Sequence, residues 1–271
     1  MLDDRLREFL DEDSTGWRDV SSSVVRGDAR ARVVTKEDGV VAGLDEASRL
    51  LGLLDSDSGV EVETRFEDGE EIEEGDTVLE AEGDATSLLR GERPCLNILG
   101  SMSGIATVTA DCVEKAGEVT VAATRKTTPG YRSFEKKAVR VGGGDPHRYS
   151  LDDVVMLKEN HIELEGLETA FERARDTKSF TSKIEVEAET VETAVEAAEL
   201  GADIVLLDNM SPSEVESCVD ELGDYDVVVE ASGGITPENV GEYAGTGVDV
   251  VSMGSLIHSS DWLDYSMRIE K

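Results

Sequence analysis

Basic residues are scarce in this 271-residue chain, in which 26 Lys and Arg stand against 61 Asp and Glu, a formal net charge of -35. Lysine is the scarcer of the two, with nine copies against 17 arginines. A surface of this sign repels nucleic acid, which we therefore exclude as a partner. High charge is also typical of disordered chains, but apolar runs such as D-I-V-L-L recur at regular intervals and indicate a folded protein.

Cysteine is rare too, and the three copies, Cys95, Cys112 and Cys218, form no C-x-x-C motif. They indicate reduced, buried thiols, with neither a disulfide framework nor a zinc site among cysteines. The first ten residues lack a basic segment followed by an apolar run, so they do not resemble a signal peptide. No stretch approaches about 18 uninterrupted apolar residues. We expect a soluble, cytoplasmic protein with no membrane partner.

The pattern of residues 1–105 predicts a small first domain. Apolar residues at helical spacing predict a helix over residues 1–13. Residues 29–83 read as short strands separated by D-G, E-D-G-E and E-E-G-D turns. This region resembles the sandwich of biotin- and lipoate-carrying domains, but a carrier needs a lysine at a hairpin tip. None occurs between Lys36 and Lys115, so a structural sandwich is expected.

A long helical region rich in small residues follows at residues 86–115. Thr86 is a candidate for its cap, while Pro94 and the S-M-S-G segment predict a break or kink.

After Gly117 the chain alternates between strands and amphipathic helices. V-T-V-A-A, S-K-I-E-V-E, A-D-I-V-L-L, Y-D-V-V-V and V-D-V-V-S read as buried parallel strands. Repeats of this kind predict an α/β barrel over residues 106–261, with residues 262–271 packing on the first domain. Barrel enzymes keep their active sites at the carboxyl ends of the strands, where Glu187, Asp208 and the Ser232-Gly233-Gly234 run are expected to fall.

Positive charge is concentrated in residues 125–148, against only Glu135 and Asp145. The seven basic residues are Arg125, Lys126, Arg132, Lys136, Lys137, Arg140 and Arg148. Guanidinium and ammonium groups beside bare glycine backbone suit a multiply charged carboxylate or phosphate. The alternative is a basic helix with salt bridges to acidic neighbours, which explains the accompanying Thr and Gly runs less well. We interpret the stretch as an anion site.

The order of residues in this stretch is more specific than its charge. It reads T-R-K-T-T-P-G from residue 124, E-K-K-A-V-R-V-G-G-G-D-P-H-R from 135 and K-E-N-H from 158. Further blocks are E-R-P-C-L-N at 92, S-G-I-A-T at 103, E-V-E-A at 185, L-L-D-N at 206, E-A-S-G-G-I at 230 and S-M-G at 252. These ordered blocks, spanning about residues 31–258, resemble the quinolinate phosphoribosyltransferase family.

The resemblance implies an α/β fold, in which an incomplete α/β barrel of parallel βα repeats follows a smaller α+β sandwich domain. It implies transfer of phosphoribose from phosphoribosyl pyrophosphate to quinolinate with decarboxylation. The products would be nicotinate mononucleotide, pyrophosphate and CO2, a step of NAD biosynthesis. The implied cofactor is Mg2+, and the implied assembly is a homo-oligomer with sites shared between subunits.

The resemblance also assigns roles to residues on the pyridine side. The positions that hold the pyridine carboxylates correspond to Arg125, Lys126, His147, Arg148 and Lys158. Arg93 matches a position that reaches into the neighbouring subunit's site. An arginine can hold a carboxylate through two parallel hydrogen bonds, which fixes the ring plane as well as neutralising charge.

On the ribose side, Glu187 and Asp208 match the family's acidic pair near the ribose and magnesium. They are expected to hold the ion through water, and together with Lys126 they are the expected catalytic residues. Bare backbone that can approach phosphate oxygens is expected in the matching loops at Ser232, Gly233, Gly234 and Gly254. The following I-T-P-E-N-V run is expected to begin a helix whose dipole adds to this site.

Two histidines have smaller expected roles, since His161 should position the Lys158 loop and His258 should be structural. Two residues depart from the family pattern. Lys137 stands where the family has Tyr, and Pro146 stands where it has Asn. Pro146 removes a backbone donor beside His147. The acidic segment at residues 12–21 also departs from the pattern and is given no function.

Other functions fit parts of this pattern. A related phosphoribosyltransferase could act on a pyridine with one carboxylate, such as nicotinate, or a transport-associated paralogue on an unknown substrate. The density of basic residues favours two carboxylates. A non-catalytic anion-binding paralogue would have lost Glu187, Asp208 or the S-G-G loop, and all are present.

The net charge of -35 predicts salt-dependent stability. Repulsion between surface carboxylates weakens folding in dilute buffer, and about 1 M salt shortens the screening length to about 3 Å. The melting temperature should therefore rise from low salt to molar potassium chloride. A melting temperature that stays flat or falls over this range would contradict salt adaptation. The prediction of phosphoribosyl transfer to quinolinate would be unaffected.

Overall fold

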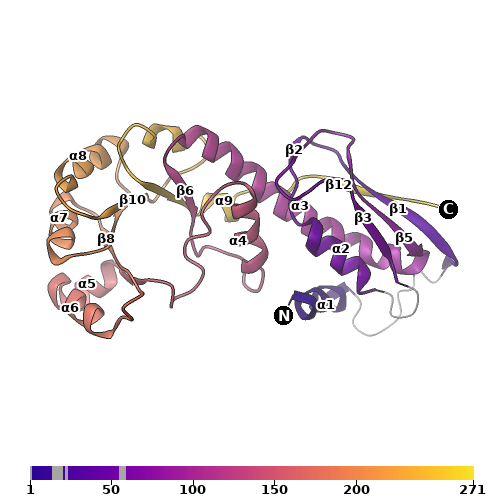
Figure 1. Ribbon diagram of the computed structural model, residues 1–271, viewed down its shortest axis with the longest axis horizontal. Coiled ribbons are helices and arrows are strands. Elements are labelled where there is room, and N and C mark those ends of the chain that lie inside the picture. The colour runs from indigo at the N-terminus through magenta and orange to yellow at the C-terminus, as the bar shows by residue number, and fades with distance from the viewer. Residues whose placement is uncertain (1, 14–20, 22–23, 55–58) are drawn as a thin grey trace. The chain divides into compact units, whose positions relative to one another are not determined.

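The computed structural model describes residues 2–13, 21, 24–54 and 59–271 (Figure 1). The chain divides into two compact units, one of Met1–Thr107 with Ser260–Lys271 and the other of Val108–Ser259. Of the acidic segment that departs from the family pattern, residues 14–20 lie outside the described part of the chain.

The first unit is built on a small antiparallel sheet in the order β12-β1-β5-β3, beside a two-stranded pair β2-β4. Its strands are β1 (Asp28–Thr35), β2 (Gly39–Val40), β3 (Glu61–Thr64), β4 (Glu71–Ile72), β5 (Thr77–Asp84) and β12 (Tyr265–Glu270). Its helices are α1 (Leu2–Asp13), α2 (Leu44–Gly52) and most of α3 (Ala85–Ala116). The carboxyl-terminal β12 pairs with β1 along its whole length, from Arg30 opposite Glu270 to Thr35 opposite Tyr265.

The local sequence explains these elements. Along β1, exposed and buried residues alternate until the strand enters the core, as expected for a sheet with one face covered. The predicted first helix is confirmed as α1, with Leu6 buried. The prediction of strands alone over residues 29–83 is wrong at α2. Its Leu44, Ala47, Leu50 and Leu51 have helical spacing and are all buried.

Helix α3 is continuous from Ala85 to Ala116 with Pro94 inside it, so of the predicted break or kink the break does not occur. The carboxylate of Asp84, rather than Thr86, accepts a hydrogen bond from the first turn, at the backbone N–H of Ser87 (3.0 Å). A Cβ at Gly104 would lie 2.0 Å from the carbonyl oxygen of Asp261, so glycine is required for this close approach. By length and composition, α3 is the one described helix that could span a membrane, but 67% of its apolar window is buried, as in a core helix.

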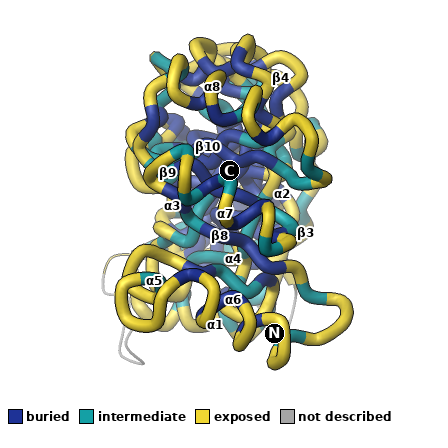
Figure 2. The backbone as a smooth tube through the Cα atoms, turned by 90° about the vertical axis from the view of Figure 1, so that its left-hand side faces the viewer, coloured by how far each residue is buried: buried dark blue, intermediate teal, exposed yellow. Residues whose placement is uncertain are grey.

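The second unit contains six parallel strands with helices between them. The strands are β6 (Thr120–Ala123), β7 (Val155–Leu157), β8 (Ile184–Ala188), β9 (Ile204–Asp208), β10 (Val228–Ser232) and β11 (Val250–Met253). The helices are α4 (Arg132–Val141), α5 (Glu159–Glu165), α6 (Leu167–Thr177), α7 (Val191–Leu200), α8 (Pro212–Leu222), the 3-10 helix η2 (Val240–Tyr243) and α9 (Ser255–His258). Burial is nearly continuous along β8, β9 and β10, which is typical of strands covered on both faces (Figure 2).

The strand order β6-β11-β10-β9-β8-β7 is that of a barrel opened at one seam. Strand β11 returns to pair with β6, whereas β6 and β7 do not pair with each other. Helices α5 to α8 lie outside the curved sheet (Figure 1). The predicted fold class, an incomplete α/β barrel after a smaller antiparallel sheet domain, is therefore confirmed.

The segment between α4 and β7 enters the seam. Asp145 forms a parallel bridge with Ala122 of β6. Its N–H donates to the carbonyl oxygen of Val121 (2.8 Å), and its own carbonyl accepts from the N–H of Ala123 (2.9 Å). This pairing fixes the position of the two residues that follow Pro146, namely His147 and Arg148.

Candidate active site

A cavity of about 530 Å³ lies at the carboxyl ends of the barrel strands. Side chains alternate across a strand, so residues two apart in β8, β9 and β10 face the same side. Glu187, Asp208 and Ser232 line this cavity, and Ser232 pairs in register with Asp208. The sequence prediction that these residues fall at strand ends is confirmed.

One side of the cavity is basic. Arg125 and Lys126 follow β6, Arg148 comes from the seam segment, and Lys158 follows β7. The Nε atom of Arg125 is buried and has no hydrogen-bond partner among the described residues. A buried donor without an acceptor costs free energy, so this atom favours binding of an anionic ligand.

The rest of the basic cluster has other contacts, so the prediction of one anion site for all seven residues needs correction. Of the seven, Arg125, Lys126 and Arg148 line this cavity. Arg132 donates to the carbonyl oxygen of Tyr149 (3.0 Å), and the buried Lys136 donates to that of His147 (2.7 Å). Burial lowers the pKa of Lys136 to about 8. These two side chains hold the seam segment in place.

A second cavity, of about 710 Å³, contains Lys136, Lys137 and Arg140. Both residues that depart from the family pattern, Lys137 and Pro146, line it. Neither Lys137 nor Pro146 lines the first cavity. Both departures from the family pattern therefore lie at the second cavity, outside the lining of the first.

The opposite side of the first cavity is acidic. Glu187 forms an ion pair with the ammonium group of Lys158. The pKa of Asp208 is raised, first by burial and then by the neighbouring charge of Glu187. Its Oδ2 accepts a hydrogen bond from the Nδ2 atom of Asn209 (2.6 Å). Two carboxylates that repel each other at the mouth of a cavity favour a cation or a hydroxyl-rich ligand between them.

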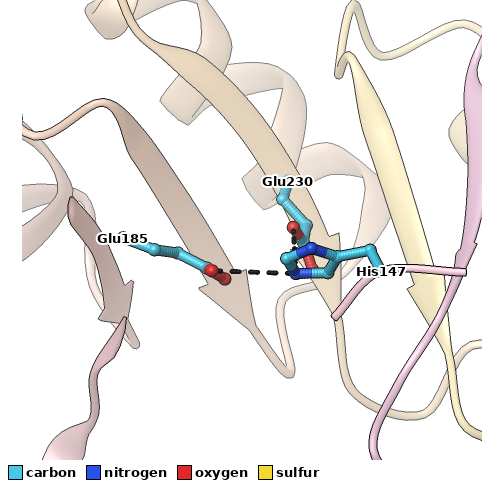
Figure 3. Close-up of side chains that lie close together, drawn as sticks. All are labelled: His147, Glu185 and Glu230. Atoms are coloured by element: carbon cyan, nitrogen blue, oxygen red, sulfur yellow. Dashed lines mark ion pairs between the residues drawn. The ribbon is translucent and has the colours of Figure 1, made fainter. Parts of the chain in front are cut away.

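Two deeper carboxylates were not predicted as site residues. Glu185 of β8 and Glu230 of β10 point toward His147, whose Nε2 lies 3.7 Å from Glu185 Oε2 and 3.8 Å from Glu230 Oε2 (Figure 3). Burial and the charge of Glu230 raise the pKa of Glu185 to about 8. Burial also raises the pKa of Glu230, while His147 opposes that rise. The signal was available, because Glu185 shares a strand face with Glu187 and Glu230 shares one with Ser232.

The loops after β9 and β10 are locked together. Asn209 has a φ of 59°, the one positive value among the described non-glycine residues. Its N–H donates to the carbonyl oxygen of Ser232 (2.8 Å). Gly233, with a φ of 88°, packs so closely that a Cβ there would lie 2.3 Å from Asn209 Oδ1. Glycine is thus required at position 233 by both its conformation and its neighbour.

The expected phosphate-binding elements also include the I-T-P-E-N-V run and Gly254. I-T-P-E-N-V does not form the expected helix, because the chain turns there and only the 3-10 helix Val240–Tyr243 follows. Pro237 precedes this helix, and the N–H of Thr236 is already satisfied by Asn239 Oδ1 (2.8 Å). Gly254 packs on the stem of Lys126 and on the ring of His258.

The two smaller histidine predictions can be compared with local contacts. The Nδ1 atom of His161 accepts the backbone N–H of Lys158 (3.0 Å), so His161 does position the Lys158 loop. His258 Nδ1 lies 2.7 Å from Ser259 Oγ. Arg93 is exposed on α3 in the first unit and is not among the residues lining the cavity.

The fold and this cavity define a barrel enzyme that can bind polyanionic ligands between a basic and an acidic wall. Residues 19–103 match the model of the quinolinate phosphoribosyl transferase N-terminal domain, and residues 105–268 match that of its C-terminal domain. The chain therefore belongs to the quinolinate phosphoribosyltransferase family.

Individual relatives cover almost the whole chain. It is 46% identical to the probable nicotinate-nucleotide pyrophosphorylase [carboxylating] of Methanothermobacter thermautotrophicus, over 98% of both chains. It is 39% identical to the human nicotinate-nucleotide pyrophosphorylase [carboxylating], over 96% of this chain and 88% of the human one. The crystal structure of NadC from Streptococcus pyogenes superposes with a TM-score of 0.93 at 41% identity, covering 99% of this chain and 96% of that one.

Proposed function

We propose that the protein transfers phosphoribose from phosphoribosyl pyrophosphate to quinolinate and releases CO2, which gives nicotinate mononucleotide in NAD biosynthesis. Family membership supports the reaction, and the observation that carries it is the two-walled cavity. Its basic wall suits an aromatic dicarboxylate, and its acidic wall suits a ribose with a departing diphosphate.

Contacts on the basic wall support binding of quinolinate there. Arg125, Lys126 and Arg148 converge on one cavity with Lys158 and His147. The unpaired Nε of Arg125 would gain an acceptor from a substrate carboxylate. A second carboxylate would meet the guanidinium of Arg148, whose Nη1 has one hydrogen bond within the described part of the chain, a 3.4 Å contact with the carbonyl oxygen of Val154. Two carboxylates on adjacent ring carbons would be neutralised together.

Contacts on the acidic wall support binding of the donor. Backbone at Gly233 and Gly234 carries no side chain, so N–H groups can approach the 5′-phosphate. Glu187 and Asp208 would hold Mg2+ through water, and their oxygen-only donors and mutual repulsion fit this ion. When bound, Mg2+ supplies charge neutralisation for the diphosphate.

The reaction follows from this arrangement. Arg125 and Arg148 hold the ring so that its nitrogen faces the anomeric carbon, and the C–N bond forms as the C–O bond to pyrophosphate breaks. Glu187 and Asp208 stabilise the positive charge that develops on the sugar. Basic groups that line the cavity stabilise the departing negative charge. The adjacent carboxylate then leaves as CO2, and the electron pair left on the ring carbon, stabilised by the pyridinium charge, takes up a proton.

Substrate choice tests the proposed function. Because the basic wall can neutralise two carboxylates, purified protein with phosphoribosyl pyrophosphate and Mg2+ should convert quinolinate to nicotinate mononucleotide. Nicotinate should be converted poorly or not at all. Product identification by mass spectrometry distinguishes the two acids, and comparable turnover of both would contradict the assignment.

A second prediction separates substrate binding from chemistry. Substituting Arg148→Ala removes a charge-assisted contact worth roughly 1.5–3 kcal/mol, so quinolinate should bind about one to two decades more weakly. Substituting Asp208→Asn should leave quinolinate binding nearly intact and lower turnover, because its contribution grows with charge on the sugar. Titration with quinolinate alone and steady-state rates test both. Loss of quinolinate binding in Asp208→Asn at unchanged turnover would reverse the two roles.

We further propose that the active unit is at least a dimer, in which Arg93 completes the site of a neighbouring subunit. Arg93 is exposed, and no hydrogen bond or ion pair joins it to another described residue.

Mixing inactive variants tests this sharing of sites. Arg93→Ala mixed with Lys126→Ala should regain activity, since hybrid assemblies contain some sites with both residues intact. Each variant incubated alone is the control. A fully active monomer in sedimentation experiments would rule the proposal out.

A further inference from the structure

Three potential metal ligands meet inside the barrel, next to the substrate cavity that two of them also line. His147 comes from the seam segment, Glu185 from β8 and Glu230 from β10, and one ligand atom of each lies within 4.8 Å of the other two. In Figure 3 the two carboxylates point toward the imidazole from different strands. The three residues are supplied by elements far apart in sequence, so the cluster is a product of the fold.

The two carboxylates of this cluster are buried side by side. Glu185 is fully buried, and neither of its oxygens accepts a hydrogen bond among the described residues. Glu230 is 3% exposed, and burial raises its pKa, while the nearby His147 and a hydrogen bond from Ser252 oppose that rise. Arg148 and Lys158 likewise oppose the rise of the pKa of Glu185, but burial and the charge of Glu230 outweigh them. A cation bound between the two carboxylates would give the oxygens of Glu185 a partner and offset the repulsion.

The neighbouring side chains do not provide that cation at contact distance. The separations from His147 Nε2, 3.7 and 3.8 Å, are too long for hydrogen bonds, which end at about 3.2 Å. Lys158 is paired with Glu187. The Nη1 atom of Arg148 is directed at the carbonyl oxygen of Val154. Arg148 acts on Glu185 and Glu230 through its charge, but no hydrogen bond or ion pair joins it to either carboxylate among the described residues.

The donor set indicates which ion. One imidazole and two carboxylates suit Zn2+ or a similar transition-metal ion better than Ca2+ or Mg2+, which prefer oxygen ligands. In a tetrahedral site, bonds of about 2.0–2.2 Å place neighbouring ligand atoms about 3.3–3.6 Å apart. The separations of 3.7 and 3.8 Å exceed this spacing slightly, so small side-chain shifts would bring these atoms to bonding distance of one ion.

We propose that His147, Glu185 and Glu230 bind a divalent transition-metal ion of the Zn2+ type within the barrel. Three protein ligands leave a fourth position open. His147 and Glu230 also line the substrate cavity, so that position faces the cavity and can accept an anionic ligand from it. The site is separate from the acidic pair Glu187 and Asp208, and it needs neither substrate to form.

Calorimetric titration with Zn2+ tests the proposal directly. The full-length protein is stripped of metal with a chelator, dialysed into molar potassium chloride to screen its acidic surface, and titrated without substrates. One saturable site per chain is expected. In Glu230→Gln the affinity for Zn2+ should fall by more than about 100-fold. Loss of a residue that only supports a metal ligand costs roughly 10–100-fold, so a larger loss identifies Glu230 as a ligand. Asp208→Asn should keep the site.

Two further variants complete the design. Glu189→Gln changes an exposed carboxylate just beyond the end of β8 and should leave the site unchanged. His147→Gln repeats the test from another element if Glu230→Gln fails to fold, as judged by its melting curve. The three cysteines are buried, and burial raises the pKa of Cys95 to about 12 and of Cys112 to about 11, so thiolates do not compete.

Absence of saturable Zn2+ binding by the wild-type protein would overturn the proposal. Equal affinity in Glu230→Gln, His147→Gln and Glu189→Gln would do the same. Because binding is measured without substrates, either result leaves the test of phosphoribosyl transfer unaffected.

Discussion

The pairing of Asp145 with β6 is the contact on which the site depends. Two backbone hydrogen bonds, 2.8 and 2.9 Å long, place a non-strand segment in the seam that β6 and β7 leave open. His147 and Arg148 follow after Pro146 and line the cavity from a position that no regular strand occupies. Lys136 and Arg132 hold the same segment from α4. The basic wall is therefore built partly by a loop acting as a missing strand.

Charge is distributed very differently in the cavity and over the chain as a whole. The chain carries a net charge of -35, yet the cavity has a basic wall. Four of the nine lysines lie in or beside the seam and the β7 loop, at Lys126, Lys136, Lys137 and Lys158. Much of the remaining positive charge forms exposed ion pairs, as at Arg30 and Lys115. The cavity thus has a basic wall although the chain as a whole is strongly acidic.

Much of this arrangement could be predicted from the sequence because residue type and strand position coincide. Glu187, Asp208 and Ser232 each end a recognisable apolar strand, so their meeting at one edge follows from parallel pairing. Helix α2 was missed, since its flanking turns are typical of strands. The expected helix at I-T-P-E-N-V does not form, because local hydrogen bonds close a turn first. Glu185 and Glu230 share strand faces with predicted site residues, so their side of the sheet could be predicted, but that both point toward His147 follows only from the tertiary structure.

The contact between Asn209 and Gly233 has a consequence for how the cavity can vary. Any side chain at position 233 must displace Asn209, and Asn209 is bonded both to Asp208 and to the backbone of Ser232. The loop after β9 and the loop after β10 therefore cannot change conformation independently of each other. The free-energy effects of substitutions in these two loops will therefore be strongly non-additive. A substitution in one loop that alters ligand binding will need a compensating substitution in the other.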